Sequence, residues 1–359
     1  MNVLGFDIGG ANIKVADAVG NTASLAFPMW TDSERLVPVL RQLASAEPFA
    51  PDLIAATMTA ELADCFQSKV AGVEFVIGAL EQAFPALPLR IWLTSGEFAE
   101  PADARELPTL VAAANWHALA TWAGRAVPVG PALLIDMGST TTDFIPLLDG
   151  QPVSYGLTDV ERLLHGELVY SGASRTPICA VVVGVPFRKK LCPVAAEVFA
   201  TMADALLIAG VIHEDAANVQ TADGRSLTMP HSLNRMARML CCDRSEITDE
   251  ELHTIANHIV ERQRKQLVEA AQQVLTQLQQ IMQQERRSLA TEKPAVILSG
   301  SGASVAKAVV AELGETLFAE QLFLPEMYHR PIAEAACAFA IARLAHDRCR
   351  DDLLETSTF

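Results

Sequence analysis

"GFDIGGANIKVADA", residues Gly5 to Ala18, sets the architecture of the chain. The apolar run 3–8 is typical of a buried strand, and Gly9-Gly10 interrupts it before a second strand that ends at a Gly-Asn turn. Strands joined by so short a turn predict a β-hairpin and not a crossover to a helix. Because Asp7 comes near the end of the first strand, we expect a carboxylate and the N–H groups of a glycine turn at one edge of a sheet.

The same design returns in the second part of the chain. "PALLIDMGSTTTDFIPLLDGQPV" predicts a strand, a tight turn and another strand, with Asp136 and Gly138 in the places of Asp7 and Gly9. This internal repeat indicates two similar lobes that face each other. The predicted lobes are an N-terminal one, residues 1–130, and a C-terminal one, residues 131–359.

Strands and helices alternate around the two hairpins. Strand patterns at 53–59 and 89–98 are followed by helical patterns, and this alternation predicts an α/β protein with mixed sheets. The helices are expected at about 33–46, over 60–70, over 107–124 and at about 332–346.

A long helical segment, about residues 231–290, is expected within the second lobe. Thr248 and Glu251 have the spacing of a capping box, and apolar residues from Leu252 to Ile281 recur at three-, four- or eight-residue intervals. The stripe predicts packing in the core of the lobe, with a dimerising coiled coil, and hence a homodimer, as the alternative. A strand, the glycine turn 298–304 and a further helix follow.

Composition limits the possible functions. The chain has 359 residues, of which 50% are hydrophobic and 19% charged, as in a globular protein with two cores. Its formal net charge of -16 argues against a nucleic-acid or acidic-membrane surface, which needs clustered cations. Seven cysteines without metal-site spacing, and no leader or membrane-length apolar run, predict a reduced, cytoplasmic location.

The glycine turns and their short hydroxyl side chains suit a phosphate group. In "DMGSTTTDF", serine and threonine hydroxyls can donate to phosphate oxygens, and the turn in "LSGSGAS" opens a helix whose N-terminus favours anions. We expect the two hairpins to hold one polyphosphate, with Asp7, Asp136 and Asp143 around a Mg²⁺ ion and Asp7 and Asp143 essential for turnover. The predicted phosphate or nucleotide ligands are Gly9, Gly10, Asn12, Lys14, Gly138, Ser139, Thr140, Thr141, Thr142, Gly300, Ser301 and Gly302.

Three glycine-bearing elements in this order resemble the actin, Hsp70 and sugar-kinase superfamily. Within it, the sequence is similar to the hydantoinase/oxoprolinase family, and there to proteins linked to tetrahydromethanopterin-dependent one-carbon transfer. The segments that carry this resemblance are "GFDIGGANIKVA", "TMTAELADCFQSKVAGV", "AAANWHA", "DMGSTTTDFIP", "GELVYSGASRTP", "FATMADALLIAG", "TADGRS" and "LSGSGAS". The resemblance implies a two-lobed actin-like ATPase fold, of the ribonuclease H-like type, with a helical insertion.

The resemblance also implies a reaction. In methanofuran biosynthesis, the phenol oxygen of γ-glutamyltyramine attacks an aminomethylfuran-methyl diphosphate, and diphosphate leaves. A cradle suited to nucleotide phosphates would also hold a departing diphosphate and stabilise its charge. The partners implied are therefore small molecules.

The same resemblance gives roles to side chains that periodicity alone would place on a solvated helical face or in the core. Glu61 or Asp64 would accept the phenol proton or bind the substrate ammonium group, and these two roles stay open. Thr59 lies near the carboxyl end of a strand, where ligand crevices open. Lys69 would bind an anionic group. By residue type alone, Arg175 could bind a carboxylate or phosphate, with a solvated loop arginine as the alternative. Asn115 and Trp116 could supply an amide and an aromatic wall, with core packing as the alternative for Trp116.

Two other functions would use the same phosphate-binding turns. An ATP-dependent small-molecule kinase or a hydantoinase/oxoprolinase-type hydrolase would cleave ATP there, and a non-catalytic module would only bind the nucleotide. Asn12 stands where many relatives carry Thr or Ser, which departs from the kinase pattern. ATP use is left open.

Overall fold

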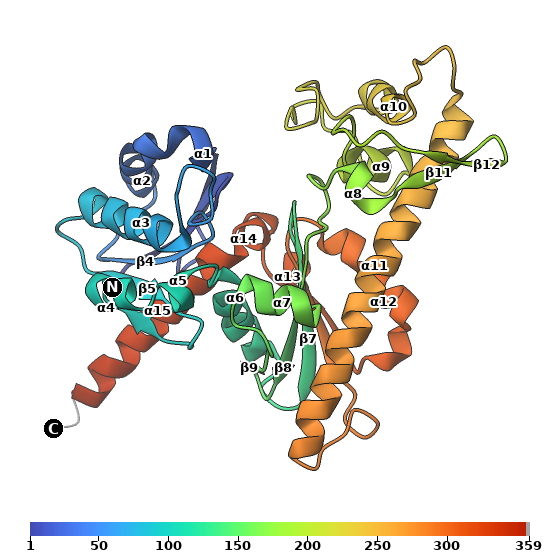
Figure 1. Ribbon diagram of the computed structural model, residues 1–359. Helices are drawn as coiled ribbons and strands as arrows, with labels where there is room; N and C mark the ends of the chain where they lie inside the picture. The colour runs from blue at the N-terminus through green and yellow to red at the C-terminus, as the bar shows by residue number, and fades with distance from the viewer. Residues whose placement is uncertain (357–359) are drawn as a thin grey trace. The chain divides into compact units, whose positions relative to one another are not determined.

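Strands β1 (Val3–Ile8) and β2 (Asn12–Asp17) form the hairpin that the opening sequence predicts. The computed structural model describes residues 1–356 (Figure 1). Backbone contacts group the chain into two compact units: unit 1 comprises residues 1–134, 145–164 and those from 323 onward, and unit 2 comprises 135–144 and 165–322.

Unit 1 is built on a six-stranded mixed sheet with the order β3-β2-β1-β4-β5-β6. β1 is antiparallel to β2 and parallel to β4, and β4 is parallel to β5. The remaining strands are β3 (Thr22–Ala26), β4 (Leu53–Met58), β5 (Leu89–Trp92) and β6 (Phe98–Ala99). The helices are α1 (Met29–Asp32), α2 (Leu36–Ala44), α3 (Lys69–Ala83), α4 (Pro101–Glu106), α5 (Pro108–Val111), α6 (Asn115–Ala123), α7 (Asp159–His165), α13 (Leu324–Met327), α14 (Arg330–Glu334) and α15 (Ala336–Thr356), with short 3-10 turns at Ser33–Arg35 and Gly124–Ala126.

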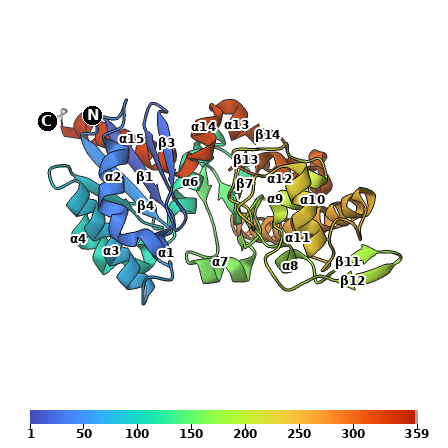
Figure 2. The ribbon, with the colours of Figure 1, turned by 90° about the horizontal axis from the view of Figure 1, so that it is seen from above.

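Alternation along β1 explains how the helices cover this sheet. Leu4, Phe6 and Ile8 are buried in one core with apolar residues of α2 and α3. On the other face a Cβ at Gly5 would meet the backbone of α15 at Ala338 and Ala342, so only glycine lets this helix pack so closely on β1. Figure 1 shows α3 and α15 on opposite sides of β4, and Figure 2 shows α2, α15 and β1 close together.

The second sheet repeats the strand order of the first. Its order is β10-β8-β7-β13-β14, and the short β9 pairs with β8 off this path. When β9 is left out of the count, both sheets place their third, second, first, fourth and fifth strands side by side. The strands are β7 (Pro131–Met137), β8 (Thr142–Leu148), β9 (Gln151–Pro152), β10 (Leu168–Val169), β13 (Ala295–Ser299) and β14 (Gln321–Phe323). This arrangement confirms the predicted fold class and the internal repeat.

Unit 2 also carries the helical insertion. Its elements are α8 (Ile178–Val181), β11 (Gly184–Phe187), β12 (Lys190–Pro193), α9 (Met202–Ile208), α10 (Met229–Arg238), α11 (Asp249–Gln284), α12 (Ala303–Leu313) and a 3-10 turn at Glu315–Leu317. The capping box of Thr248 and Glu251 is confirmed at the start of the 36-residue α11. Its apolar stripe is buried inside unit 2, where α11 packs against α9, α10 and α12, as the predicted core packing requires. The homodimer stays a prediction.

Several predicted boundaries differ from the structure. The segment 60–68 forms turns instead of a helix, because the Ser68 side chain caps α3 at its N-terminus and starts the helix only at Lys69. The helix expected over 107–124 is two helices, separated at Ala112–Ala114, where Ala113 has a φ of +50°. The expected 231–290 segment divides into α10 and α11.

The two units also differ from the predicted lobes 1–130 and 131–359. Residues from 323 onward belong to unit 1, because α15 packs on β1, β2 and β4. No helix within residues 1–356 is both long and apolar enough to cross a membrane.

Candidate functional site

The first hairpin is closed by one main-chain hydrogen bond. The Gly9 N–H donates to the Asn12 carbonyl at 3.0 Å, and a Cβ on Gly9 would lie 2.8 Å from that oxygen. Thr59 passes beside this turn, since its N–H donates to the Ile8 carbonyl at 2.9 Å. Gly10 has open space where a side chain would be. The turn is therefore tight on its inner side and open on its outer side.

Asp7 lies under this turn in an unusual environment for a carboxylate. The strand register pairs it with Lys14 on β2 and with Thr57 on β4, which places all three side chains on one face of the sheet. Asp7 is 9% exposed, and neither its Oδ1 atom nor the Thr57 Oγ1 atom has a hydrogen-bond partner within the described chain. Burial raises the pKa of Asp7, and the charge of half-buried Lys14 opposes this.

The second hairpin has the same closure. The Gly138 N–H donates to the Thr141 carbonyl at 2.9 Å, the bond that joins Gly9 and Asn12 in the first hairpin. Asn12 therefore corresponds to Thr141. Asp136 precedes Gly138 by two residues, as Asp7 precedes Gly9. The repeat that the sequence predicts extends to this backbone hydrogen bond.

The carbonyl groups of the second hairpin are held by the segment 173–175. The Ala173 N–H donates to the Gly138 carbonyl at 2.9 Å, and the N–H groups of Ser174 and Arg175 donate to the Ser139 carbonyl at 3.1 and 2.7 Å. In a trans peptide the C=O and N–H groups point in opposite directions. The N–H groups of Ser139 and Thr140 therefore point away from this segment and can donate to an anion.

A third segment completes the arrangement in unit 2. Gly302 donates its N–H to the Met137 carbonyl at 2.8 Å and forms the N-cap of α12. Gly300 has a φ of +85°, and a Cβ there would collide with the Met137 carbonyl and lie 2.8 Å from the Asp136 Oδ1 atom. The two glycines bring the N-terminus of an 11-residue helix against the second hairpin. Ser301, between them, is exposed.

Gly300→Ala tests this close approach, and Gly314→Ala is its matched control. Both glycines have positive φ and flank α12, but a Cβ at Gly314 meets nothing within 4 Å. Gly314→Ala should cost only the penalty of its backbone conformation, φ +101° and ψ +113°, about 1–3 kcal/mol. Gly300→Ala should cost about 1–3 kcal/mol more, because Met137 must also move. Urea unfolding of both variants measures the difference, and equal losses would contradict the close packing.

Thr142 differs from its predicted role as a phosphate ligand. Its fully buried hydroxyl donates to the Ser171 carbonyl at 2.6 Å, so its single proton is used inside the protein. The hydroxyls of Ser139 and Thr140 are 3.4 Å apart and only half-buried, which keeps them available. Asp143 is on β8 opposite Leu168 of β10 and is half-buried.

A second group of functional side chains gathers in unit 1 just after β4. Glu61 is 1% exposed, and its Oε2 atom has no hydrogen-bond partner within residues 1–356. Burial is the main cause that raises the pKa of Glu61 to about 7. Its own N–H has the next largest effect and lowers the pKa, whereas the Asp159 charge raises it further. Smaller lowering effects come from the Lys69 charge and the Ala113 N–H. The Lys69 ammonium lies 3.8 Å from the Asp159 carboxylate. A carboxyl group with this pKa is suited to exchange a proton near neutral pH.

The structure adds Arg162 and His117, which the sequence did not single out. Arg162, on α7, is 1% exposed, and its guanidinium lies 4.1 Å from the centre of the Trp116 ring. Burial and the charge of Arg162 lower the pKa of His117 to about 4, so this imidazole is neutral at pH 7. Trp116 thus has a cationic neighbour, as well as the core position that its burial indicates. Only the fold brings these distant segments together, so no local signal could have found Arg162.

Other predicted residues lie apart from this group. Asp64 is exposed, whereas Glu61 three residues earlier is buried, so the shared helical face predicted for them is wrong because 60–68 is not helical. The Asn115 amide points to the Cys337 sulfur of α15, 3.9 Å away. The Arg175 side chain is exposed. The substrate roles of Asn115 and Arg175 remain predictions, whereas its exposure makes Asp64 a weaker candidate for the base than the buried Glu61.

No group of three or more His, Cys, Asp or Glu residues within residues 1–356 is arranged to hold a metal ion. Asp7 belongs to unit 1, and Asp136 and Asp143 belong to unit 2. The shared Mg²⁺ site therefore stays a prediction. The donor type fits in one respect, since the buried Asp7 Oδ1 atom lacks a partner and carboxylate oxygens are preferred Mg²⁺ ligands.

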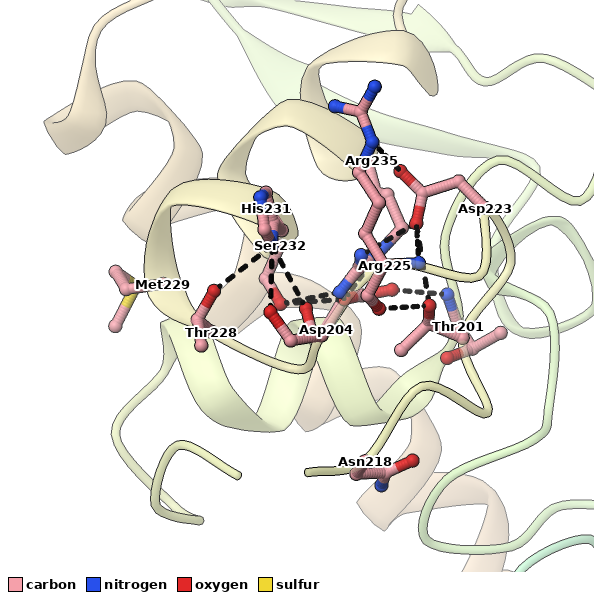
Figure 3. Close-up of polar contacts among 12 residues, drawn as sticks. Thr201, Asp204, Asn218, Asp223, Arg225, Thr228, Met229, His231, Ser232 and Arg235 are labelled. Carbon is pink, nitrogen blue, oxygen red and sulfur yellow. Dashed lines mark hydrogen bonds and ion pairs between the residues drawn. The ribbon is translucent and has the colours of Figure 1, made fainter. Parts of the chain in front are cut away.

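The "TADGRS" motif has a structural role outside this site. Arg235 of α10 donates to the Asp204 Oδ1 atom from Nε at 2.9 Å and from Nη2 at 2.7 Å, and its Nη1 atom donates to Asp223 at 2.8 Å (Figure 3). Ser232 also donates to Asp204, at 2.7 Å, and Asp204 accepts the Thr201 N–H. The motif is thereby attached to α9 and α10.

The paired glycine hairpins and the repeated strand order define a two-unit α/β protein with a duplicated mixed sheet and hairpin. Comparison with family models makes this more specific. The chain belongs to the hydantoinase/oxoprolinase family, whose model matches residues 52–348.

Two curated relatives share more of the sequence. A (4-{4-[2-(γ-L-glutamylamino)ethyl]phenoxymethyl}furan-2-yl)methanamine synthase from Methanocaldococcus jannaschii is 32% identical over 345 residues, 95% of this chain and 97% of the relative. A synthase of the same name from Methanococcus vannielii is 30% identical over 212 residues, 59% of this chain and 89% of the relative. Both relatives are enzymes, and this chain is an enzyme.

Solved structures with lower similarity were also found. A ROK family glucokinase from Streptomyces griseus, in complex with glucose and AMPPNP, has a TM-score of 0.47 and 14% identity, covering 96% of this chain and 99% of the other. The (R)-2-hydroxyglutaryl-CoA dehydratase component A from Acidaminococcus fermentans has a TM-score of 0.43 and 12% identity, covering 96% of each.

Proposed function

We propose that this enzyme condenses γ-glutamyltyramine with an aminomethylfuran-methyl diphosphate in methanofuran biosynthesis, as a transferase serving tetrahydromethanopterin-linked one-carbon transfer. A bond forms between the phenol oxygen and the furan methylene carbon, the bond from that carbon to the diphosphate oxygen breaks, and the phenol proton is released. The observation that carries the proposal is the match over 95% of the chain to a synthase of this product.

The leaving diphosphate needs groups that stabilise the charge it gains. In the proposal these are the Ser139 and Thr140 N–H groups, whose carbonyl partners are held on the other side, and the N-terminus of α12. Donors fixed in this way need little rearrangement during the reaction.

The phenol must lose its proton as the new bond forms. Glu61 is the proposed base, because burial raises its pKa to about 7 and a fraction of its carboxyl groups is then ionised at neutral pH. Trp116, with Arg162 over its ring, supplies the proposed aromatic wall for the phenol or the furan. Lys69 is the proposed contact for an anionic substrate group.

Mg²⁺ is the proposed metal, and Asp7, Asp136 and Asp143 are the residues proposed to hold it. When bound, it would neutralise part of the diphosphate charge. Asp7 carries its negative charge at a cost, because burial raises its pKa. Such a cost is typical of a functional carboxylate.

Asp7→Asn is expected to separate function from stability. Turnover should fall by more than about 100-fold, because losing a group that only supports a metal ligand already costs about 10- to 100-fold. The melting temperature at pH 7 should stay level or rise, because an acid whose pKa is raised by folding costs stability above its unfolded pKa of 3.8. Steady-state kinetics and thermal unfolding test this, and a variant with full turnover would remove Asp7 from the site.

A direct assay tests the function itself. Purified enzyme, γ-glutamyltyramine, the furan diphosphate and Mg²⁺ should give equal amounts of the ether and diphosphate without ATP, measured by mass spectrometry and a diphosphate assay. Absence of the ether, or product formation that requires ATP, would overturn the proposal in favour of a kinase or hydrolase.

A further inference from the structure

The segment 171–175 supports the second hairpin instead of binding an anion through its own backbone. All five of its N–H groups are used inside the protein: Ser171 donates to the Val169 carbonyl, Gly172 to the Thr176 hydroxyl, and the other three to the carbonyls of Gly138 and Ser139. A Cβ on Gly172 would lie 2.5 Å from the Thr140 nitrogen. The segment therefore packs directly on the peptide whose N–H the ligand would use.

One side chain of the long helix holds this segment in turn. Gln263, near the middle of α11, is 1% exposed. Its Nε2 atom donates to the Gly172 carbonyl at 2.8 Å and to the Ser171 hydroxyl at 2.9 Å. The two amide protons are thus donated to two consecutive residues of the segment 171–175.

We propose that Gln263 is a positioning residue for diphosphate binding. Through the segment 171–175 it fixes the carbonyls of Gly138 and Ser139, and this orientation points the N–H groups of Ser139 and Thr140 at the ligand. The inference rests on the proposed function, because the ligand is the diphosphate. Gln263 itself touches no ligand atom in this proposal.

The amide of Gln263 satisfies both acceptors. Leucine would fill a similar volume but leave the Gly172 carbonyl buried without a donor. Glutamate would place a carboxylate against that carbonyl, and only its protonated form could donate one hydrogen bond. Gln263→Leu and Gln263→Glu therefore weaken the contact with the segment 171–175 in ways that the pH dependence distinguishes.

The same helix offers a matched control. Gln277 is also buried on α11, and its Nε2 atom donates to the His165 carbonyl at 2.8 Å. Its contact lies outside the segment 171–175, so Gln277→Leu should cost comparable stability without changing the second hairpin. Any effect common to both leucine variants is structural.

The experiment titrates the full-length enzyme with inorganic diphosphate and Mg²⁺ in a calorimeter. Gln263→Leu should bind about tenfold more weakly than wild type, and Gln277→Leu should bind like wild type. Gln263→Glu should bind diphosphate weakly at neutral pH. As the pH is lowered and the glutamate becomes protonated, its affinity should approach that of wild type measured at the same pH. In turnover, Gln263→Leu should raise KM for the furan diphosphate and leave KM for the phenol unchanged.

The outcomes separate the two proposals. If wild type does not bind diphosphate, the proposed function fails and this inference with it. If wild type binds and Gln263→Leu binds equally well, the positioning role alone is overturned. If both leucine variants lose the same affinity, the effect is general destabilisation and the inference is again wrong.

Discussion

Glu61→Gln lowers kcat by about 10²- to 10⁴-fold in our expectation, with little change in KM for the furan diphosphate, because it removes the proposed base and keeps the shape of the side chain. Asp64→Asn is the matched control. Asp64 lies only three residues away and is exposed, so its loss should leave kcat near the wild-type value. Steady-state kinetics with saturating phenol substrate measures both. A Glu61→Gln variant with half of the wild-type kcat would exclude this residue as the base.

The pH dependence of the wild-type enzyme gives an independent check on Glu61. A base must be deprotonated, so kcat should rise as the pH passes through about 7 and then level off, and Glu61→Gln should lack this step. Stability should change in the opposite direction. The folded protein holds the proton up to about pH 7 and the unfolded chain releases it near 4.5, so stability falls as the pH rises between these values.

The burial of Glu61 could not be predicted from the sequence. An acidic residue after a buried strand is visible in the sequence, but its burial depends on Gly72, where a Cβ would meet the Glu61 backbone. The helix expected over 60–70 gave Glu61 and Asp64 one shared face. The turns at 60–68 instead give them opposite exposures. Local periodicity could not distinguish these arrangements, because a distant contact decides between them.

The hairpins were predictable for the opposite reason. In each, the Asp, the glycine and the residue that closes the turn lie within six positions, so the geometry is local. The Gly9–Asn12 and Gly138–Thr141 hydrogen bonds follow from that spacing. Gln263 lies 92 positions from Ser171, within a run of polar and charged residues that does not single it out. Contacts of this kind become visible only when the sheet and the long helix are placed together.

Arg235→Met should destabilise the protein by about 3–5 kcal/mol, because it leaves the Asp204 carboxylate buried without its charge partner. Asp204 is fully buried and the Arg235 side chain is 1% exposed, so solvent cannot replace the lost ion pair. Methionine preserves much of the volume, which separates the charge effect from a cavity. Urea unfolding monitored by circular dichroism measures the loss of free energy.

Asp223→Asn is the control, since it removes the outer partner of the same arginine. The Asp223 side chain is 21% exposed, so water can replace the carboxylate and the loss should stay below about 1 kcal/mol. Burial raises the pKa of Asp223, but the Arg225 N–H and Arg235 outweigh it and hold this pKa low. Its contribution is therefore present above pH 3.8 and disappears as the pH falls below that value. Equal losses for the two variants would show that Arg235 acts mainly through the "TADGRS" motif, and a loss under about 1 kcal/mol for Arg235→Met would mean that water reaches Asp204.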